Sequence, residues 1–169
     1  MKALLLGCGE MGEEALRDLY EFGHFNELLI GTRTVSKAHL VIDTLKPNTT
    51  KISVHEIDAS DIKSLAELME GCAVAVNCIG PNYKYELPIA FAAIRAKVNL
   101  VDINDEYEVT PKMYDLHNDA VKENILIIVG LGGCPGIDNV LARSAANQRR
   151  KDGNKILQRL SPKRKARKS

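Results

Sequence analysis

Three glycines near the start of the chain are spaced in a way that suits the binding of a phosphate-containing ligand. Gly7, Gly9 and Gly12 form the pattern G-x-G-x-x-G directly after a short apolar run. In such a loop the first glycine permits a tight turn, the second lets backbone approach a pyrophosphate, and the third lets a helix pack closely on a strand. The free N–H groups at the helix start attract the anion. The pattern predicts a dinucleotide site that includes Glu10 and Met11, and the alternative is a glycine turn that binds nothing.

A second group of polar residues follows the next apolar run, and its chemistry selects between two cofactors. An acid at this place would accept hydrogen bonds from the free ribose 2′-hydroxyl of NAD. The run instead ends in hydroxyls and cations, at Thr32, Arg33, Thr34 and Lys37. Guanidinium and ammonium groups bind phosphate well. The sequence therefore favours NADP, with NAD as second choice, although an Arg33 that stacks on adenine would be compatible with either.

Two further segments are expected to complete the cofactor site. Asp58 and Ala59 follow the third apolar run, where such folds bring a loop near the adenine, and the alternative is that Asp58 or Ser60 caps the next helix. A sharp Gly-Pro bend follows the fourth run, at the sheet edge where ligands bind. This segment is expected to line the nicotinamide ribose, through Asn77, Cys78, Ile79, Gly80 and Pro81.

The elements that would position these residues are visible as an alternation of short apolar runs with stretches of helical period. Strands are predicted over residues 2–6, 27–31, 51–57, 73–78, 99–103 and 125–130. Helices are predicted over 10–23, 35–46, 60–70, 84–97 and 110–123, with a further one from Gly136. Runs that are apolar on both faces indicate a parallel sheet with helices on both sides.

The third run alternates apolar and polar residues, which suits a strand at the sheet edge. Right-handed crossovers then favour the strand order 3-2-1-4-5-6. The predicted fold class is therefore α/β, a Rossmann doubly wound parallel sheet of about six strands.

The composition divides the 169 residues into two parts. Hydrophobic residues at 45% and charged residues at 27% are typical of one soluble globular domain. Residues 1–148 hold 13 Lys and Arg against 21 Asp and Glu, whereas residues 149–169 hold 10 basic residues and one acid. We predict a dinucleotide-binding domain over 1–148 and a basic tail over 149–169 that is disordered or weakly helical. Nucleic acid is not expected as a partner, because a solvated chain end is the commoner role of such a tail.

The chain shows no signal for a membrane or for a metal. No apolar run approaches the roughly 18 residues that cross a bilayer, and the first run is too short for a signal peptide. The four cysteines have neither a CxxC pair nor dense spacing, so neither a zinc site nor a disulfide framework is predicted. These features predict a cytoplasmic protein.

Three longer segments make the chain similar to a known family. They are NCIGPNY with LPIA at 77–90, VDINDE at 101–106, and GLGGCPGIDN at 130–139. They resemble saccharopine dehydrogenase-like proteins, the group of saccharopine and carboxynorspermidine dehydrogenases, over about residues 1–148. The resemblance implies an NAD(P)-dependent oxidoreductase in which hydride passes to or from the imine of a secondary amine that links amino-acid or polyamine units. It also implies a further α/β lobe for the substrate and the dimer contact, which is expected to be absent from this chain.

The resemblance leaves the catalytic residues open. Imine chemistry needs groups that move protons near the operating pH. Asp102, at the end of the fifth run, is well placed for this task, and a structural role is the alternative. Cys134 stands where saccharopine-reductase-like members have an acid before the Pro-Gly pair, and a thiol can also act as acid or base. The alternative function is a non-catalytic module that binds NADP without turnover. Assembly into a homo-oligomer is compatible with either function.

Overall fold

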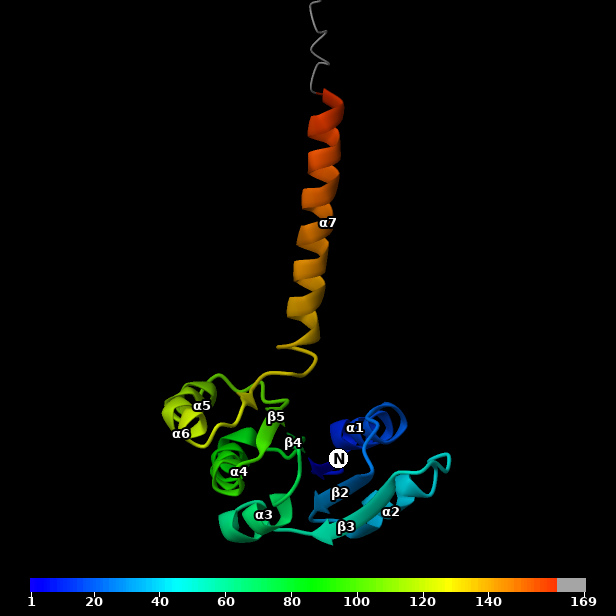
Figure 1. Ribbon diagram of the computed structural model, residues 1–169, viewed down its shortest axis with the longest axis vertical. Coiled ribbons are helices and arrows are strands. Elements are labelled where there is room, and N and C mark those ends of the chain that lie inside the picture. Colours follow the sequence, from blue (N-terminus) through cyan, green and yellow to red (C-terminus); the bar gives the residue numbers. More distant parts are fainter. Residues whose placement is uncertain (161–169) are drawn as a thin grey trace, which may run out of the picture.

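A parallel sheet of six strands forms the centre of the molecule (Figure 1). The computed structural model describes the backbone of residues 1–160 and the side chains of residues 1–150. The strand order is β3-β2-β1-β4-β5-β6, which confirms the predicted doubly wound Rossmann fold with its third strand at an edge. The strands are β1 (Lys2–Leu6), β2 (Glu27–Thr32), β3 (Lys51–Glu56), β4 (Val74–Asn77), β5 (Asn99–Asp102) and β6 (Ile127–Ile128).

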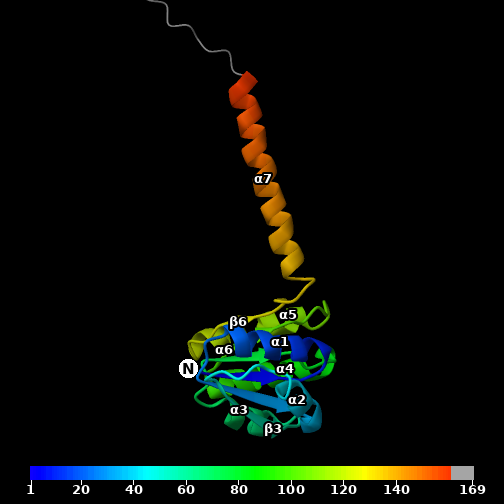
Figure 2. The ribbon, with the colours of Figure 1, turned by 90° about the vertical axis from the view of Figure 1, so that its right-hand side faces the viewer.

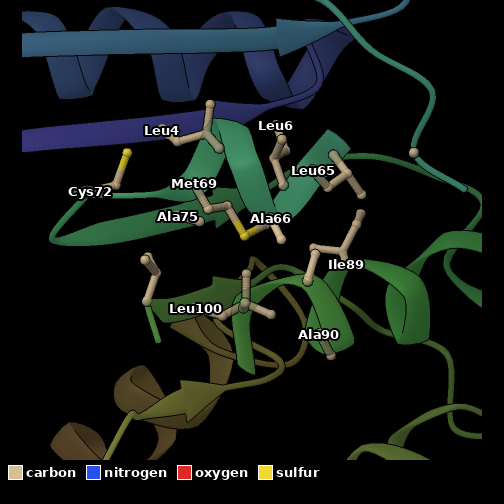
Figure 3. Close-up of a cluster of buried hydrophobic side chains, with 14 of the residues drawn as sticks. Leu4, Leu6, Leu65, Ala66, Met69, Cys72, Ala75, Ile89, Ala90 and Leu100 are labelled. Carbon is tan, nitrogen blue, oxygen red and sulfur yellow. The ribbon is translucent and has the colours of Figure 1, made fainter. Parts of the chain in front are cut away.

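Helices cover both faces of the sheet, and the alternation of side chains along β1 shows why. Leu4 and Leu6 belong to one hydrophobic cluster, whereas Ala3 and Leu5 belong to the other, because successive strand residues point to opposite faces. Figure 3 shows the first cluster, in which β1 packs with residues of α3 and α4. The helices are α1 (Glu10–Phe22), α2 (Val35–Ile42), α3 (Ile62–Met69), α4 (Asn82–Ala96), α5 (Thr110–Asp115), α6 (His117–Lys122) and α7 (Ile137–Leu160).

The structure differs from the predicted elements at three places. The helix predicted over 110–123 is two helices that meet at Leu116. The last strand contains only Ile127 and Ile128, because these are the residues that pair with β5. Helix α4 begins at Asn82, directly after the Gly-Pro bend, rather than at residue 84.

Helix α7 leaves the body of the molecule and extends away from it (Figure 2). Its described apolar side chains are exposed, with Ile137, Val140 and Leu141 each more than 60% accessible. The helix crosses residue 148 without a break and continues to Leu160, so the change in charge there is not matched by a change in secondary structure. Residues 161–169 of the predicted tail lie outside the described part of the chain. Within that described part, no helix combines the length and apolarity that a bilayer span requires.

Candidate functional site

The glycine loop joins β1 to α1, and two of its glycines are required by the fold itself. Gly7 has a φ of +89°, and a Cβ there would lie 2.9 Å from the side chain of Ile79. A Cβ at Gly12 would overlap the carbonyl group of Gly7. Gly7 therefore permits the turn, and Gly12 permits the close packing of helix on strand, as the sequence pattern predicts.

Gly9, the second glycine of the loop, behaves differently. Gly9 is the N-cap of α1 and has an ordinary φ of −88°, and a Cβ added to it would meet no atom within 4 Å. Gly80, after β4, is equally free of neighbours. The protein therefore does not need glycine at these two positions for its own packing. The space in front of both backbones is available to a ligand.

A first cavity of about 670 Å³ lies where β1, β2, β3 and β4 end. It brings together most of the residues predicted to bind the cofactor. Those that line it are Gly7, Gly9, Thr32, Arg33, Thr34, Lys37, Asp58, Ala59, Cys78, Ile79 and Gly80. Their assignment to the cofactor stays a prediction, but one continuous surface now contains them.

The part of the first cavity that lies at the ends of β2 and β3 contains both cationic and acidic side chains. Arg33 and Lys37 supply the cations, whereas Glu56 and Asp58 supply the acids. Two hydrogen bonds from Ser60, at 2.6 and 2.9 Å, lower the pKa of Asp58. Neither Asp58 nor Ser60 is the N-cap of α3.

The cap of α3 is Asp61, which accepts hydrogen bonds from the backbone of Lys63 and Ser64. The alternative that assigned the cap to Asp58 or Ser60 is therefore wrong. Asp58 instead lines the first cavity.

Helix α4 adds two cavity residues that the sequence pattern did not indicate. Lys84 and Tyr85 line the first cavity, and the Lys84 ammonium lies 4.7 Å from the centre of the Tyr85 ring. This contact places a cation over an aromatic face, and the polar interaction of the Lys84 ammonium with the Tyr85 hydroxyl raises the pKa of Lys84. The two residues give the first cavity an aromatic surface and a third cation, opposite the loops that follow β2 and β3.

A second cavity of about 430 Å³ adjoins the first and shares a wall with it. We call this shared wall the seam: Gly9, Cys78, Ile79 and Gly80 line both cavities. Beyond the seam, the second cavity is lined by Glu10, Met11, Asn82, Ile103, Asp105, Gly132, Gly133 and Cys134. Its charged side chains, Glu10 and Asp105, are both acidic, so its field favours a cation.

The two cysteines of the second cavity are thiols rather than thiolates at neutral pH. Burial raises the pKa of Cys78 to about 11, and a hydrogen bond to Asp138 raises the pKa of Cys134. Cys134 is exposed at the second cavity, but its thiol hydrogen bond is made to Asp138 and its raised pKa makes it a weak acid at neutral pH. Among the residues that the structure describes, no three His, Cys, Asp or Glu side chains are grouped to bind a metal.

Asp102 does not face either cavity. It is completely buried, and its carboxylate accepts hydrogen bonds from the side chain of Asn77 at 2.7 Å and from the backbone of Asn104 at 2.8 Å. The expectation of direct contact with a substrate is therefore not supported by the geometry, because the side chain points into the body. Three predicted cofactor residues line neither cavity: Gly12 and Asn77 are buried, whereas Pro81 is exposed.

The parallel sheet, the glycine loop at the start of α1 and the cavities at the carboxyl ends of the strands define a dinucleotide-binding domain of the Rossmann class. Residues 3–128 match the family model described as the saccharopine dehydrogenase NADP binding domain. The chain belongs to this family, which confirms the resemblance found in the sequence and supports NADP or NAD as its cofactor.

Individual relatives agree with this assignment. The chain is 28% identical over 158 residues to the saccharopine dehydrogenase of Schizosaccharomyces pombe that is named for NADP⁺ and the formation of L-glutamate. The aligned region covers 94% of this chain and 33% of that enzyme. The apo L-Glu-forming saccharopine dehydrogenase of Saccharomyces cerevisiae superposes with a TM-score of 0.72 at 23% identity, over 90% of this chain and 32% of the other. A shikimate 5-dehydrogenase from Listeria monocytogenes shares the fold at a TM-score of 0.54 and 18% identity, over 78% of this chain and 46% of the other. The chain thus spans about a third of the length of its saccharopine dehydrogenase relatives.

Proposed function

We propose that this chain is the cofactor-binding part of an NADP-dependent oxidoreductase that acts on the imine of a secondary amine joining amino-acid or polyamine units. The saccharopine dehydrogenase from S. pombe, named for NADP⁺ and for the formation of L-glutamate, supports this substrate class by similarity. The structural feature that supports this proposal most directly is the seam. Two glycines that the fold does not need leave backbone exposed where two cavities meet.

The shape of the two cavities suits the two halves of a dinucleotide. The first cavity, with Arg33 and Lys37, suits the adenosine half and its 2′-phosphate. The seam lies beside the N-terminus of α1, whose free N–H groups suit the pyrophosphate. The second cavity then receives the nicotinamide half. A methyl group at Gly9 or Gly80 would occupy the path between the halves.

The second cavity has the electrostatic character that imine chemistry requires. Bound NADPH donates a hydride, and NADP⁺ accepts one. Glu10 and Asp105 stabilise a positive charge beside the seam, and a protonated imine is a cation that accepts hydride more readily than a neutral one. The thiol of Cys134 lies on the same wall and stays neutral, so the negative charge of the second cavity comes from the two carboxylates.

Turnover is proposed to need a further lobe. Hydride transfer requires that the substrate be fixed in a near-attack geometry. The described residues enclose the second cavity with the glycine loop, the segments after β4 and β5, and the Gly132–Cys134 turn. Because the relatives are about three times as long as this chain, we infer that a further lobe contributes the remaining substrate contacts.

Alanine substitution at the seam tests the cofactor site. Gly9→Ala and Gly80→Ala are expected to weaken NADPH binding about fivefold or more, since overpacking costs about 1–3 kcal/mol. Their melting temperatures should equal that of the unchanged chain, because the added Cβ meets no protein atom. Calorimetric titration with NADPH measures the affinity, and circular dichroism measures the melting temperature.

Gly133→Ala is the matched control. Gly133 also has free space around its Cβ, but it lines only the second cavity. The Gly133→Ala variant should bind 2′,5′-ADP, an analogue of the adenosine half, as the unchanged chain does, because Gly133 does not line the first cavity. Unaltered NADPH affinity in both seam variants would overturn the proposed site.

A non-catalytic nucleotide-binding module is the second candidate, and it is favoured by the family match, which is to an NADP binding domain alone. The two candidates differ in turnover and not in NADPH binding. Oxidation of NADPH can be followed by absorbance with pairs of an amino acid and an aldehyde or oxo acid. Tight NADPH binding without oxidation for any pair would favour the module.

A further inference from the structure

A group of buried polar side chains lies directly behind the seam and the second cavity. Asn77, Asp102 and Asn104 are at most 1% accessible, and none of them lines a cavity. With Asn82 and Glu106 they form what we call the buried polar network. Buried polar groups require partners, and the partners in this case are the two segments that form the cavity walls.

The first part of the network fixes the seam. The side-chain amide of Asn77 donates to Asp102 at 2.7 Å, and its side-chain oxygen accepts from the backbone N–H of Ile79 at 3.0 Å. Ile79 belongs to the seam. Asp102 therefore orients Asn77, and Asn77 fixes the backbone of the wall that both cavities share.

The second part of the network joins the segment after β5 to the start of α4. The backbone N–H of Asn104 donates to Asp102 at 2.8 Å. The side-chain oxygen of Asn104 accepts from the Asn82 amide at 3.0 Å and from the Glu106 backbone at 2.7 Å. The carboxylate of Glu106 in turn accepts from the backbone of Tyr83 at 2.9 Å.

These bonds connect two walls of the same cavity. The segment after β5 contributes Ile103 and Asp105 to the second cavity, and the segment after β4 contributes the seam and Asn82. A change in the network would move both walls together. The separation of the walls, and hence the fit of a ligand at the seam, depends on it.

Glu86 lies in the second turn of α4 and is completely buried. Among the described residues, neither of its carboxyl oxygens has a hydrogen-bond partner, and the same holds for the side-chain nitrogen of Asn104. Burial, followed by the charge of Asp102, raises the pKa of Glu86 to about 8, and the nearby Asn104 side chain offsets this in part. Glu86 is therefore mostly protonated at neutral pH.

The charged groups that act on Glu86 are both acidic and both belong to this region: Asp102 at the end of β5 and Glu106 before α5. The faces of α3 and α5 that pack in the same cluster as α4 are apolar, with Leu65, Met69 and Met113. An ionised Glu86 would thus repel Asp102 and Glu106, which are the two carboxylates of the network, and no cation among the described side chains acts on it to compensate.

We propose that the buried polar network is a positioning device for the cofactor, and that it keeps the walls of the two cavities aligned only while Glu86 is protonated. Asn77, Asp102 and Asn104 are positioning residues in this proposal, since they act through the backbone of the walls. The proposal rests on the binding of the cofactor at the seam.

The first test is the affinity for NADPH between pH 6.5 and 9.5 at constant ionic strength, by calorimetry on the full chain. Affinity should be constant to about pH 7.5 and about tenfold weaker at pH 9 than at pH 7, since apparent affinity scales with the competent fraction. Glu86→Gln should bind as the unchanged chain does at pH 7 and retain that affinity at pH 9. Glu67→Gln, an exposed acid on α3 paired with Lys63, should keep the original pH profile.

The second test needs no ligand. The backbone N–H groups of Ile79, Tyr83 and Glu106 donate to network side chains. Their hydrogen-exchange protection, corrected for the intrinsic effect of pH, should fall above about pH 8 in the unchanged chain and not in Glu86→Gln. Constant protection overturns the positioning role, as does an equal loss of NADPH affinity in Glu86→Gln. If NADPH does not bind at any pH but hydrogen-exchange protection still falls above about pH 8 as expected, the proposed cofactor site is overturned and the proposed role of the network in holding the walls is retained.

Discussion

Arg33 and Lys37 supply cations to the first cavity, while Glu56 and Asp58 supply acids to the same surface. A 2′-phosphate beside the cations would form charge-assisted hydrogen bonds, and the hydroxyls of Thr32 and Thr34 can add neutral ones. The balance between NADP and NAD is thus decided by individual residues and not by the fold. We propose that Arg33 is the residue whose removal separates the two cofactors.

Replacement of Arg33 by methionine is expected to weaken NADPH binding about tenfold or more and to change NADH binding by less than about twofold. The reason is that only NADPH carries the 2′-phosphate. The difference should shrink at high salt, because exposed charges are screened. Lys63→Met, which removes an exposed cation that lines neither cavity, is the control, and titrations with both nucleotides at two salt concentrations provide the measurement. Equal losses for NADPH and NADH would contradict the assignment.

At the scale of the elements, α1 can pack against the end of β1 only because position 12 is a glycine, which has no Cβ. Gly12 lies in the first turn of α1, and its Cβ would overlap the Gly7 carbonyl. The neighbour is backbone, which cannot move aside as the end of a side chain can. The position of α1, and with it the direction of its free N–H groups, is set by this contact.

Gly12→Ala is expected to destabilise the chain by about 1–3 kcal/mol, the usual cost of overpacking, and also to weaken NADPH binding. Urea denaturation gives the first quantity, and titration gives the second. Gly9→Ala serves as the comparison, because it should change only the affinity. A Gly12→Ala chain with unchanged stability would show that α1 can shift without cost.

The element pattern of the sequence was sufficient for the sheet and its order. The break at Leu116 was not predictable, because Met113, Leu116 and Ala120 are buried at spacings that also suit one continuous helix. The strand predicted over 125–130 was too long, since apolar character does not reveal how many residues pair at a sheet edge.

For the site, local sequence pattern identified the loops that follow β1, β2, β3 and β4. It did not identify Asn104 and Glu106 as parts of a network, since their partners Asn82 and Tyr83 lie about 20 residues away in the chain. It did not identify Glu86, which has no hydrogen-bond partner among the described residues. Lys84 and Tyr85 were missed as cofactor-cavity residues for a related reason. No motif marks which face of the first turn of α4 lies at the cavity. Asp102 was recognised as important from its place at the end of β5, but only its partners reveal a positioning role.

At the scale of the whole molecule, an acidic body is joined to a basic helix. Residues 1–148 carry an excess of acids, and residues 149–169 carry 10 basic residues and one acid. The residues that line both cavities all precede α7, and the described apolar side chains of α7 are exposed. The fold of the body and its cofactor site are therefore expected to be independent of the basic segment.

A chain shortened to residues 1–148 should melt within about 2 °C of the full chain, a difference below about 1 kcal/mol. At physiological salt it should bind NADPH with the same affinity. At low salt its affinity should be lower, because the basic segment no longer attracts the phosphates over a distance. Circular dichroism and titration at two salt concentrations measure these effects. Loss of the folded state would place part of α7 in the body and move the predicted domain boundary.

Gly12 is expected to respond to natural selection differently from Gly9 and Gly80. A substitution at Gly12 damages the folded body, so selection for a folded protein alone removes it. A substitution at Gly9 or Gly80 leaves the body intact and obstructs only the ligand. A lineage that no longer needs the cofactor would therefore accumulate side chains at Gly9 and Gly80 first, while Gly12 stays glycine. The state of these positions in a descendant would distinguish a working dinucleotide site from an inherited scaffold.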